Sequence, residues 1–356
     1  MALHDQKSLM GPGEPQPRPI FAHLQRAGQA EYAIGEFRAW AGYKNLGSDV
    51  ATDDLIHLQH VLSFAATEAA GRTGVHAHLA HAHIVIPTSG RAVFSYDGVA
   101  TEAVPGVVIV QHGGTIHDQY DYSYAPASAA ENRATPLSVE SPPPGAPARS
   151  FGFLELFVPK LFANVEIVPP AEVTPELERT AWDHPYHPPG ACFSLQTADA
   201  PGAAYRPLAG RPGLEVRDCE TWGPSGGLVA TWILRPRSLG RPPADPIDMA
   251  LGGETDGIEI LFVVAGQVVF ARPGGEQLRL HAGDTLTCGQ GWLGDVVAWS
   301  SDLSLLRFHI AARARDLPRS SPEDIARLEA LGPAIITRSE VRPDGDPRPV
   351  NCLRTG

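Results

Sequence analysis

Residues 75–84 read Val-His-Ala-His-Leu-Ala-His-Ala-His-Ile, so four of the fourteen histidines of the chain fall within eight positions. His76 and His78 are two residues apart, and side chains at that spacing on a β-strand project from the same face. Histidine is the commonest transition-metal ligand, so two imidazoles on one face can bind one ion together. The stretch therefore predicts a metal-binding protein whose site is built on strands.

The sequence around this stretch is typical of an all-β protein. The chain has 356 residues, of which 36 are glycine and 34 are proline, and it has few long helical patterns. This composition favours many strands joined by turns. In the first half of the chain, apolar or alternating runs predict strands at residues 58–66, 76–78, 83–87, 92–96, 107–110 and 151–159.

The second half of the chain repeats the first. Gly90-Arg-Ala-Val-Phe is matched by Gly266-Gln-Val-Val-Phe, and each is followed by a turn, a strand and a further glycine, Gly106 or Gly283. Two copies of one β unit are the simplest explanation of this match. Strands are predicted in the second half at residues 227–234, 258–264, 267–271, 284–287 and 303–310.

The histidine stretch resembles the first of the two motifs of the cupin superfamily. That family motif is roughly G-x5-H-x-H-x3-4-E-x6-G. Here His76-x-His78-x4-His83-x6-Gly90 is similar to it, with His83 where the family usually has glutamate. The preceding glycine, Gly71, stands one residue closer to the first histidine than the family motif places it.

A later stretch resembles the second family motif, roughly G-x5-P-x-G-x2-H-x3-N. Gly106-x5-His112-x-Gly114-x2-His117 has the same spacing, with His112 in place of the proline and Asp121 in place of the asparagine. The two motifs also occur in the family order. The resemblance implies an all-β fold with two cupin barrels, of the double-stranded β-helix or jelly-roll type, in one chain: a bicupin.

The resemblance is close over about residues 58–160 and degenerate over 214–310. We therefore expect an N-terminal arm and capping segment (1–56), a metal-binding cupin barrel (57–165), a linker (166–213), a degenerate cupin barrel without a metal site (214–312), and a C-terminal helix and tail (313–356). Residues 123–150 are rich in Ala, Ser and Pro and are expected to be an excursion from the first barrel. Thr174-Pro175 and Ser321-Pro322 are typical of helix starts.

Carried over residue by residue, the resemblance implies that His76, His78, His83 and His117 hold one metal ion. Four imidazoles on an inward face are costly to bury without a partner, and one divalent ion satisfies all four. A surface histidine run, or a histidine cluster with ordinary hydrogen bonds, is the alternative. His81 lies in the connection between strands, where the family has no ligand, and is expected to stay outside the ligand set.

Three further histidines are expected to play no part in binding the ion. His112, at a turn, either lines the mouth of the site or is a plain turn residue. His57 and His60 fall on opposite faces of one strand, so at most one of them points inward. We expect both to be structural.

The second barrel is expected to lack the metal chemistry. Gly252 and Glu254 stand at the places of the first two histidines, Glu259 at that of the third and Gly294 at that of the last. One lone carboxylate cannot hold a catalytic metal. This barrel is therefore expected to be structural, shaping the pocket or forming a dimer interface.

An all-imidazole site is neutral and leaves the full charge on the ion. Such a site holds Fe(II), Ni(II), Mn(II), Cu(II) or Zn(II). Bicupins of about this length include ring-cleaving dioxygenases of the gentisate type, which bind Fe(II) through histidines and whose second motif is similar to Thr115-Ile116-His117-Asp118. The resemblance therefore favours Fe(II) and a dioxygenase, an oxidoreductase acting on a small aromatic or enolic oxygenated substrate.

Two other classes of function stay open. Cupins with a fourth ligand include isomerases, lyases and cyclases, whose metal chemistry is non-redox, and a bicupin can also bind a small molecule without turnover. The catalytic residues are open as well, and the candidates on or next to the motif strands are Tyr96, Gln111 and Arg91. Arg91 either binds a substrate carboxylate or lies on the surface.

Tyr120, Tyr122 and Tyr124 alternate along the chain, so we expect them to share one face of a strand. They would form an aromatic pocket wall or part of an ordinary half-buried strand.

Charge and composition limit the partners. The formal net charge is −12 and no Lys/Arg-rich run is present, which argues against nucleic acid. No apolar stretch approaches the ~18 residues of a membrane span, and the first residues lack an apolar leader segment. The four cysteines form no C-x-x-C pair. We expect a cytoplasmic homodimer or higher homo-oligomer whose partner is a small-molecule substrate.

Overall fold

The computed structural model describes residues 20–23, 30–34, 37–45, 52, 55–64, 73, 76–78, 80–96, 99–112, 117–134, 149–158, 164–167, 193–197, 203–238, 246, 249, 257–272, 274–289, 292, 294–317, 334–338 and 351–353. In some of these strands, including the one that carries His76 and His78, only the backbone is described. The helices expected to start at Thr174 and Ser321 lie outside the described residues. No helix within the described ranges is long and apolar enough to cross a membrane.

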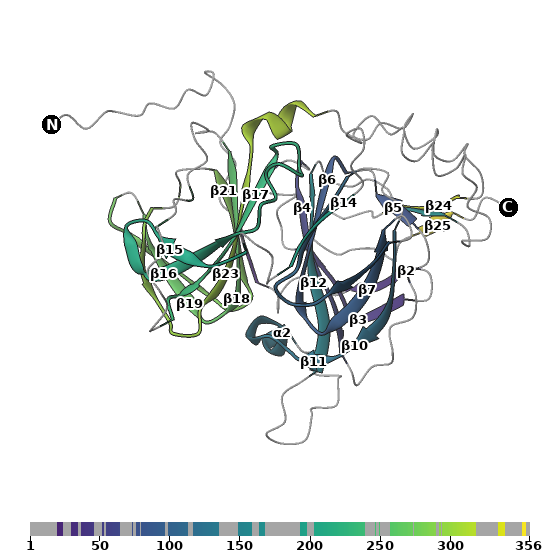
Figure 1. The fold of residues 1–356 in the computed structure, drawn as a ribbon, viewed down its shortest axis with the longest axis horizontal. Helices are drawn as coiled ribbons and strands as arrows, with labels where there is room; N and C mark the ends of the chain where they lie inside the picture. The colour runs from purple at the N-terminus through teal and green to yellow at the C-terminus, as the bar shows by residue number, and fades with distance from the viewer. Residues whose placement is uncertain are drawn as a thin grey trace.

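The first lobe contains two antiparallel sheets, drawn mostly in blue and purple in Figure 1, with β14 in teal and with β24 and β25 in yellow. Their strand orders are β14-β9-β6-β12-β4-β3-β2 and β25-β24-β13-β5-β10-β7-β8. The inner faces of the two sheets meet in an apolar core that includes Phe94 and Phe153. The strands of the first sheet are β2 (Ala30–Ile34), β3 (Phe37–Asn45), β4 (His57–Phe64), β6 (Ala82–Ser89), β9 (Val108–His112), β12 (Arg149–Val158) and β14 (Phe193–Gln196). Those of the second are β5 (His76–His78), β7 (Arg91–Tyr96), β8 (Val99–Ala103), β10 (His117–Ser123), β13 (Asn164–Ile167), β24 (Ala334–Arg338) and β25 (Asn351–Leu353).

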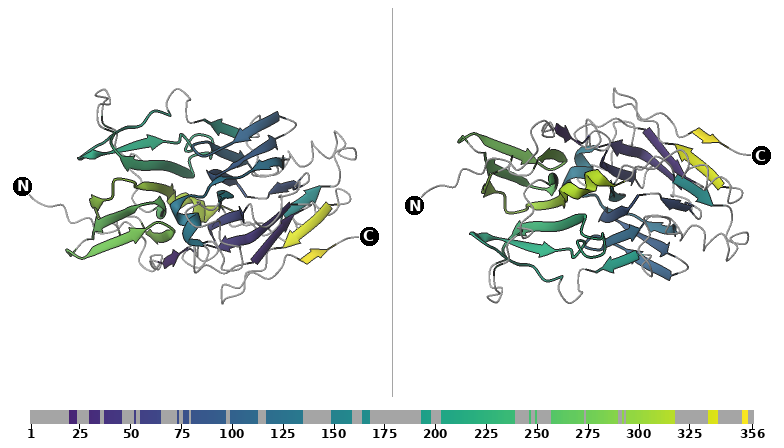
Figure 2. Two further views of the ribbon diagram at one scale, coloured as in Figure 1. Left: turned by 90° about the horizontal axis from the view of Figure 1, so that it is seen from below. Right: turned by 90° about the horizontal axis from the view of Figure 1, so that it is seen from above.

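The second lobe, in teal and green, also has two sheets, and the two lobes remain distinct from below and from above (Figure 2). The strand orders are β1-β21-β18-β23-β17-β16-β15 and β20-β19-β22. Trp232 and Phe270 belong to the core between these sheets. The strands are β1 (Ile20–His23), β15 (Arg206–Leu208), β16 (Arg211–Asp218), β17 (Val229–Pro236), β18 (Ile258–Ala265), β19 (Gln267–Ala271), β20 (Gln277–His281), β21 (Asp284–Gly289), β22 (Val296–Trp299) and β23 (Ser304–Ile310).

The two lobes share one topology. The order β9-β6-β12-β4-β3-β2 of the first lobe corresponds strand by strand to β21-β18-β23-β17-β16-β15 of the second. The register corresponds too, because His83 pairs with Gln111 and Phe157 while Glu259 pairs with Cys288 and His309. The expected all-β fold with two repeated barrels is therefore confirmed, and Glu259 is the structural counterpart of His83.

The two barrels exchange edge strands. Each barrel is completed by a strand from the segment that comes just before the other barrel in the sequence. β1 is N-terminal to the first barrel but pairs with β21 of the second, opposite residues 284–287. β14 comes after the first barrel, at the start of the second half, and pairs with β9 of the first. Figure 1 shows the teal strand β14 among the blue strands of the first lobe. This exchange of edge strands ties the two lobes together through backbone hydrogen bonds.

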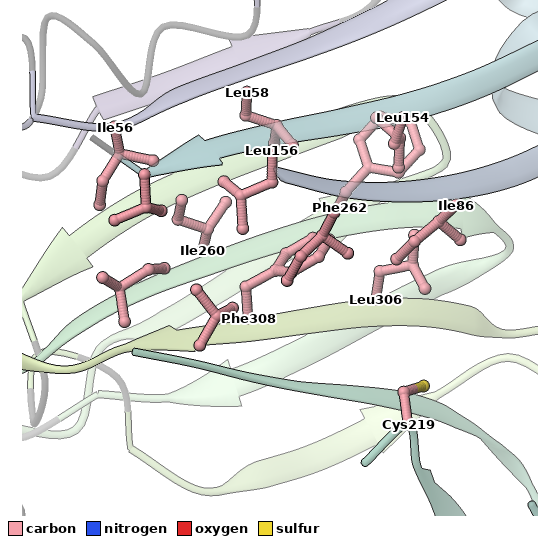
Figure 3. Packing of buried hydrophobic residues seen from close by; sticks show 14 of the residues in the cluster. Ile56, Leu58, Ile86, Leu154, Leu156, Cys219, Ile260, Phe262, Leu306 and Phe308 are labelled. Carbon is pink, nitrogen blue, oxygen red and sulfur yellow. The ribbon is translucent and has the colours of Figure 1, made fainter. Parts of the chain in front are cut away.

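The large sheets of the two lobes pack against each other through their outer faces (Figure 3). Because side chains alternate along a strand, Ile84 and Ile86 of β6 face the second lobe while His83 faces the interior of the first. Phe262 and Phe308 supply much of the opposing apolar surface, and all four apolar side chains are buried. The stretch expected as an excursion holds β11 (Ala125–Pro126) and α2 (Ala129–Ala134), and α2 contacts β18.

Candidate metal centre

His83 lies inside the first barrel on the inward face of β6. Only 1% of its surface is exposed. Its ring stacks on that of Phe157 in β12, with 4.1 Å between ring centroids and an angle of 15° between planes. This stacking fixes the plane of the imidazole.

His117 reaches the same interior from the facing sheet. It begins β10 and is 1% exposed. Its ring stacks on Tyr96 at 5.6 Å, and its centroid lies 6.4 Å from that of His83. The metal–nitrogen distance in such sites is about 2 Å, so two rings at this separation can approach one ion from opposite sides. Two residues 34 positions apart in the sequence are thus neighbours in one buried site.

His76 is placed by backbone register alone. It pairs with His117 on one side and with Glu166 on the other, while His78 pairs with Asn164. The histidine strand is therefore the direct neighbour of the strand that brings His117. The imidazoles of His76 and His78 lie outside the described residues, as does the side chain of His112.

A carboxylate that sequence reasoning missed also lies in this site. Glu155 occupies the middle of β12, is 1% exposed, and has its Oε1 atom 3.2 Å from Nε2 of His83. Its Oε2 atom accepts a hydrogen bond from Nε2 of Gln59, and Oε1 of Gln59 lies 2.9 Å from Nε2 of His57. A signal was present, because Glu155 alternates in phase with the inward-facing Phe153 and Phe157 of an otherwise apolar strand.

Two of the three candidate catalytic residues lie beside His117. The side-chain amide nitrogen of Gln111 donates a hydrogen bond to the Tyr96 hydroxyl at 3.4 Å, and both side chains are buried. Burial, and after it the charge of Glu155, raises the pKa of Tyr96 well above its ordinary value. The phenol therefore stays protonated at neutral pH and can donate a hydrogen bond.

Arg91, the third candidate, lies away from this site. It is on the outer face of β7 and forms ion pairs with Glu102 and, at 3.1 Å, with Asp121. Its side chain is 37% exposed. The alternation Ala92, Phe94, Tyr96 directs the other face of this strand inward, so the position of Arg91 follows from its phase.

The three tyrosines do not form one continuous face. Asp121 has a positive φ of 54°, and the pairing of β10 with β7 shifts register between Tyr120 and Ser123. This β-bulge interrupts the alternation expected from sequence. Tyr122 packs edge-on against Phe151, at the end of β12 that is opposite to Phe157 and His83.

The remaining described histidines have separate environments. His81 lies near the second lobe, where a Cβ on Gly226 would be 3.5 Å from its Nε2 atom, and burial and then the charge of Arg313 lower its pKa. His57 faces the interior of the first barrel, where its Nε2 atom lies 2.9 Å from Oε1 of Gln59. His60 faces the other lobe, where its ring stacks on Phe262 at 5.8 Å.

The second barrel replaces this site with a buried ion cluster. Glu259, at the counterpart of His83, accepts hydrogen bonds from Nε of Arg307 at 2.7 Å and pairs with Nδ1 of His309 at 2.9 Å. The expectation of a lone carboxylate was wrong, because β23 contributes a cation and an imidazole through sheet pairing. At Gly294, the counterpart of His117, a Cβ would lie 1.8 Å from the carbonyl oxygen of Ala271, so the backbone leaves no room for an imidazole.

The Glu259 cluster predicts a dependence of stability on pH. Burial alone would raise the pKa of Glu259, but the charge of Arg307 and the contacts with His309 outweigh it and lower that pKa. A carboxyl with a lowered folded-state pKa stabilises the protein above its unfolded pKa of about 4, and this contribution disappears as pH falls through the folded value. We expect Glu259→Gln to lower the free energy of unfolding at pH 7, and the difference from wild type to narrow below about pH 4. Urea unfolding of both proteins between pH 3 and 7 measures this. A difference that does not change with pH would contradict the assignment.

Within the described part of the chain, no three His, Cys, Asp or Glu side chains form a group that could hold a metal ion. A metal site here therefore needs at least one donor side chain that lies outside the described set, and His76 and His78 are candidates because their strand pairs with the one that begins at His117. The donor set fits such an ion: two buried imidazoles from facing sheets, a buried carboxylate beside one of them, and a histidine strand paired with the other.

Comparison with known proteins gives no match to any protein-family model and none among curated sequences. Among solved structures, the chain is similar to vicilin from Corylus avellana (hazelnut), at 10% identity over 82% of this chain and 86% of that one, with a TM-score of 0.46. It is also similar to a salicylate 1,2-dioxygenase mutant from Pseudoaminobacter salicylatoxidans in complex with gentisate (16% identity, 92% and 88% coverage, TM-score 0.45). Oxalate decarboxylase from B. subtilis is a third (10% identity, 82% and 79% coverage, TM-score 0.44). The duplicated topology of this chain, given by its own strand orders, fits a bicupin.

Proposed function

We propose that the first barrel binds one divalent transition metal through His76, His78, His83 and His117, and that the chain is a metal-dependent cupin enzyme. The favoured reaction is Fe(II)-dependent dioxygenation of a small aromatic or enolic oxygenated substrate. The observation that carries the proposal is the meeting of His83 and His117, both buried, from facing sheets with 6.4 Å between their ring centroids.

A bound divalent ion would supply Lewis acidity and, as Fe(II), a route for electrons between substrate and O2. The protein would hold the imidazole ligands in position and exclude water from the site. Phe157 holds the ring of His83, and Tyr96 holds the ring of His117. The Tyr96 hydroxyl and the Gln111 amide are the polar groups beside His117 that can orient an oxygen atom of a substrate.

One observation favours a second class of function. Glu155 brings a buried carboxylate within 3.2 Å of His83. Carboxylates move protons in general acid–base catalysis, which isomerases, lyases and cyclases need. A non-redox metal enzyme is therefore the second candidate.

The test compares the two classes directly. Protein loaded with Fe(II) under argon is mixed with aerated solutions of phenols, hydroxylated benzoates and diketones, and O2 uptake is recorded with an electrode. We expect substrate-dependent uptake that His117→Ala lacks. Turnover by Zn(II)- or Mn(II)-loaded protein without O2 would favour the non-redox class. Tight metal binding without turnover across the panel would favour a non-catalytic binding protein and contradict the enzyme proposal.

A further inference from the structure

We propose that Glu155 is a ligand of the metal site, so that the ion is bound by a carboxylate as well as by imidazoles. The inference rests on the proposed function, because it concerns the same ion. It changes the chemistry of the site, since a carboxylate ligand lowers the net charge of the metal centre and favours harder ions than imidazoles alone would.

The two donor atoms lie close together inside the first barrel. Oε1 of Glu155 lies 3.2 Å from Nε2 of His83. Metal–nitrogen and metal–oxygen bonds of about 2.0–2.2 Å place two neighbouring ligand atoms about 3 Å apart. The pair therefore already has the spacing of two donors on one ion. Neither β6 nor β12 has to move for both atoms to bind it.

Hydrogen bonds fix the orientation of the Glu155 carboxylate. Gln59 donates from its amide nitrogen to Oε2 of Glu155, so the amide oxygen of Gln59 must accept from Nε2 of His57. This chain of two side chains on β4 holds one carboxylate oxygen and turns the other toward His83. Ligands of metal ions are commonly oriented in this way by hydrogen bonds to residues behind them.

Glu155 brings a carboxylate into the buried interior of the barrel. A buried carboxylate is costly unless a cation or several donors compensate it. In the second barrel, Arg307 compensates Glu259. The counterpart of Arg307 in the first barrel is Glu155 itself. Glu155 lies two residues before the residue that pairs with His83, and Arg307 lies two residues before the residue that pairs with Glu259. Within the described residues, no arginine or lysine forms an ion pair with Glu155, whereas a divalent cation between Glu155 and His83 would balance it.

The second barrel thus has a pair at the same two positions with the charges exchanged. Its acidic residue, Glu259, stands at the position of His83, and its basic residue, Arg307, stands at the position of Glu155. The carboxylate that the family has at the position of His83 is supplied here by the neighbouring strand, at position 155. A direct hydrogen bond between His83 and Glu155 is the competing explanation of the contact, and it predicts that Glu155 contributes nothing to metal affinity.

The experiment uses Co(II) as the probe, because its visible d–d bands report the ligand set independently of turnover. Co(II) affinity is measured by competition with a chelator for wild type, Glu155→Gln and Glu131→Gln. Glu131 is a matched control: it is fully buried in the same lobe, but it belongs to α2 and lies 3.6 Å from His60, which faces the other lobe. We expect Glu155→Gln to weaken Co(II) binding by about tenfold or more and to shift its bands, while Glu131→Gln changes neither.

A second variant protects the test against misfolding. Glu155→Asp keeps the carboxylate and shortens its reach by one methylene, so we expect a shifted Co(II) spectrum with a smaller loss of affinity than in Glu155→Gln. Wild-type Co(II) binding that depends on His117, combined with unchanged affinity and spectrum in both Glu155 variants, would overturn this inference alone. Failure of the wild type to bind Co(II) would overturn the proposed function with it.

Discussion

His117→Ala should bind a divalent metal ion on the order of 100-fold more weakly than the wild type. His117 is the described ligand candidate that comes from outside the histidine stretch, and it begins the strand that pairs directly with His76. The His117→Ala substitution removes one donor from the site. It also removes the imidazole that faces His83 from the opposite sheet. Metal content after purification without added metal, and affinity by chelator competition, measure the effect.

The control is His281→Ala. His281 ends β20 of the second lobe on an exposed position, so its removal should leave metal content unchanged. Because His117 also packs on Tyr96, circular dichroism must show that the His117 variant is folded. His117→Gln fills the same space with a weaker ligand and should lose most of the affinity too. Equal metal occupancy in His117→Ala, His281→Ala and wild type would contradict the site.

The inward positions on the strands could be predicted from the sequence, because alternation decides which residues share a face. Glu259 was matched to His83 from the spacing of the repeat, and the register confirms that match. The partners of these two residues could not be predicted. Glu155 and Arg307 enter through the pairing of β6 with β12 and of β18 with β23, and sequence alternation does not say which strands become neighbours.

The exchange of β1 and β14 was unpredictable for a related reason. β1 pairs with residues more than 250 positions later, and neither strand carries a motif that specifies its partner. Backbone hydrogen bonds can form at any free strand edge, so the local sequence of β1 or β14 does not identify its partner. The same holds for Asp121, where a bulge reorients the tyrosines that simple alternation aligns.

One buried arginine connects the lobes at the place where β14 joins the first barrel. Arg217 of β16 is 1% exposed and is among the largest fully buried side chains of the described residues. Its guanidinium donates to the carbonyl oxygen of Gly106, to Oε1 of Gln196 at 2.9 Å and to the carbonyl oxygen of Thr197 at 3.2 Å. All three acceptors are uncharged and belong to the turn before β9 or to β14 and the residue after it.

Arg217→Met should therefore destabilise the protein by about 1–3 kcal/mol, because it leaves the buried Oε1 atom of Gln196 and two half-buried carbonyl oxygens without this donor. Methionine fills most of the volume, so the loss reports hydrogen bonds rather than a cavity. Urea unfolding followed by both tryptophan fluorescence and circular dichroism measures it, and the two probes separate if the lobes unfold independently. Arg91→Met is the control, since Arg91 forms ion pairs on the outer surface and its replacement should leave the urea midpoint unchanged. If Arg217→Met unfolds at the wild-type midpoint, the contact between Arg217 and β14 does not hold the lobes together, and the exchanged strands and the apolar interface around Phe262 must suffice.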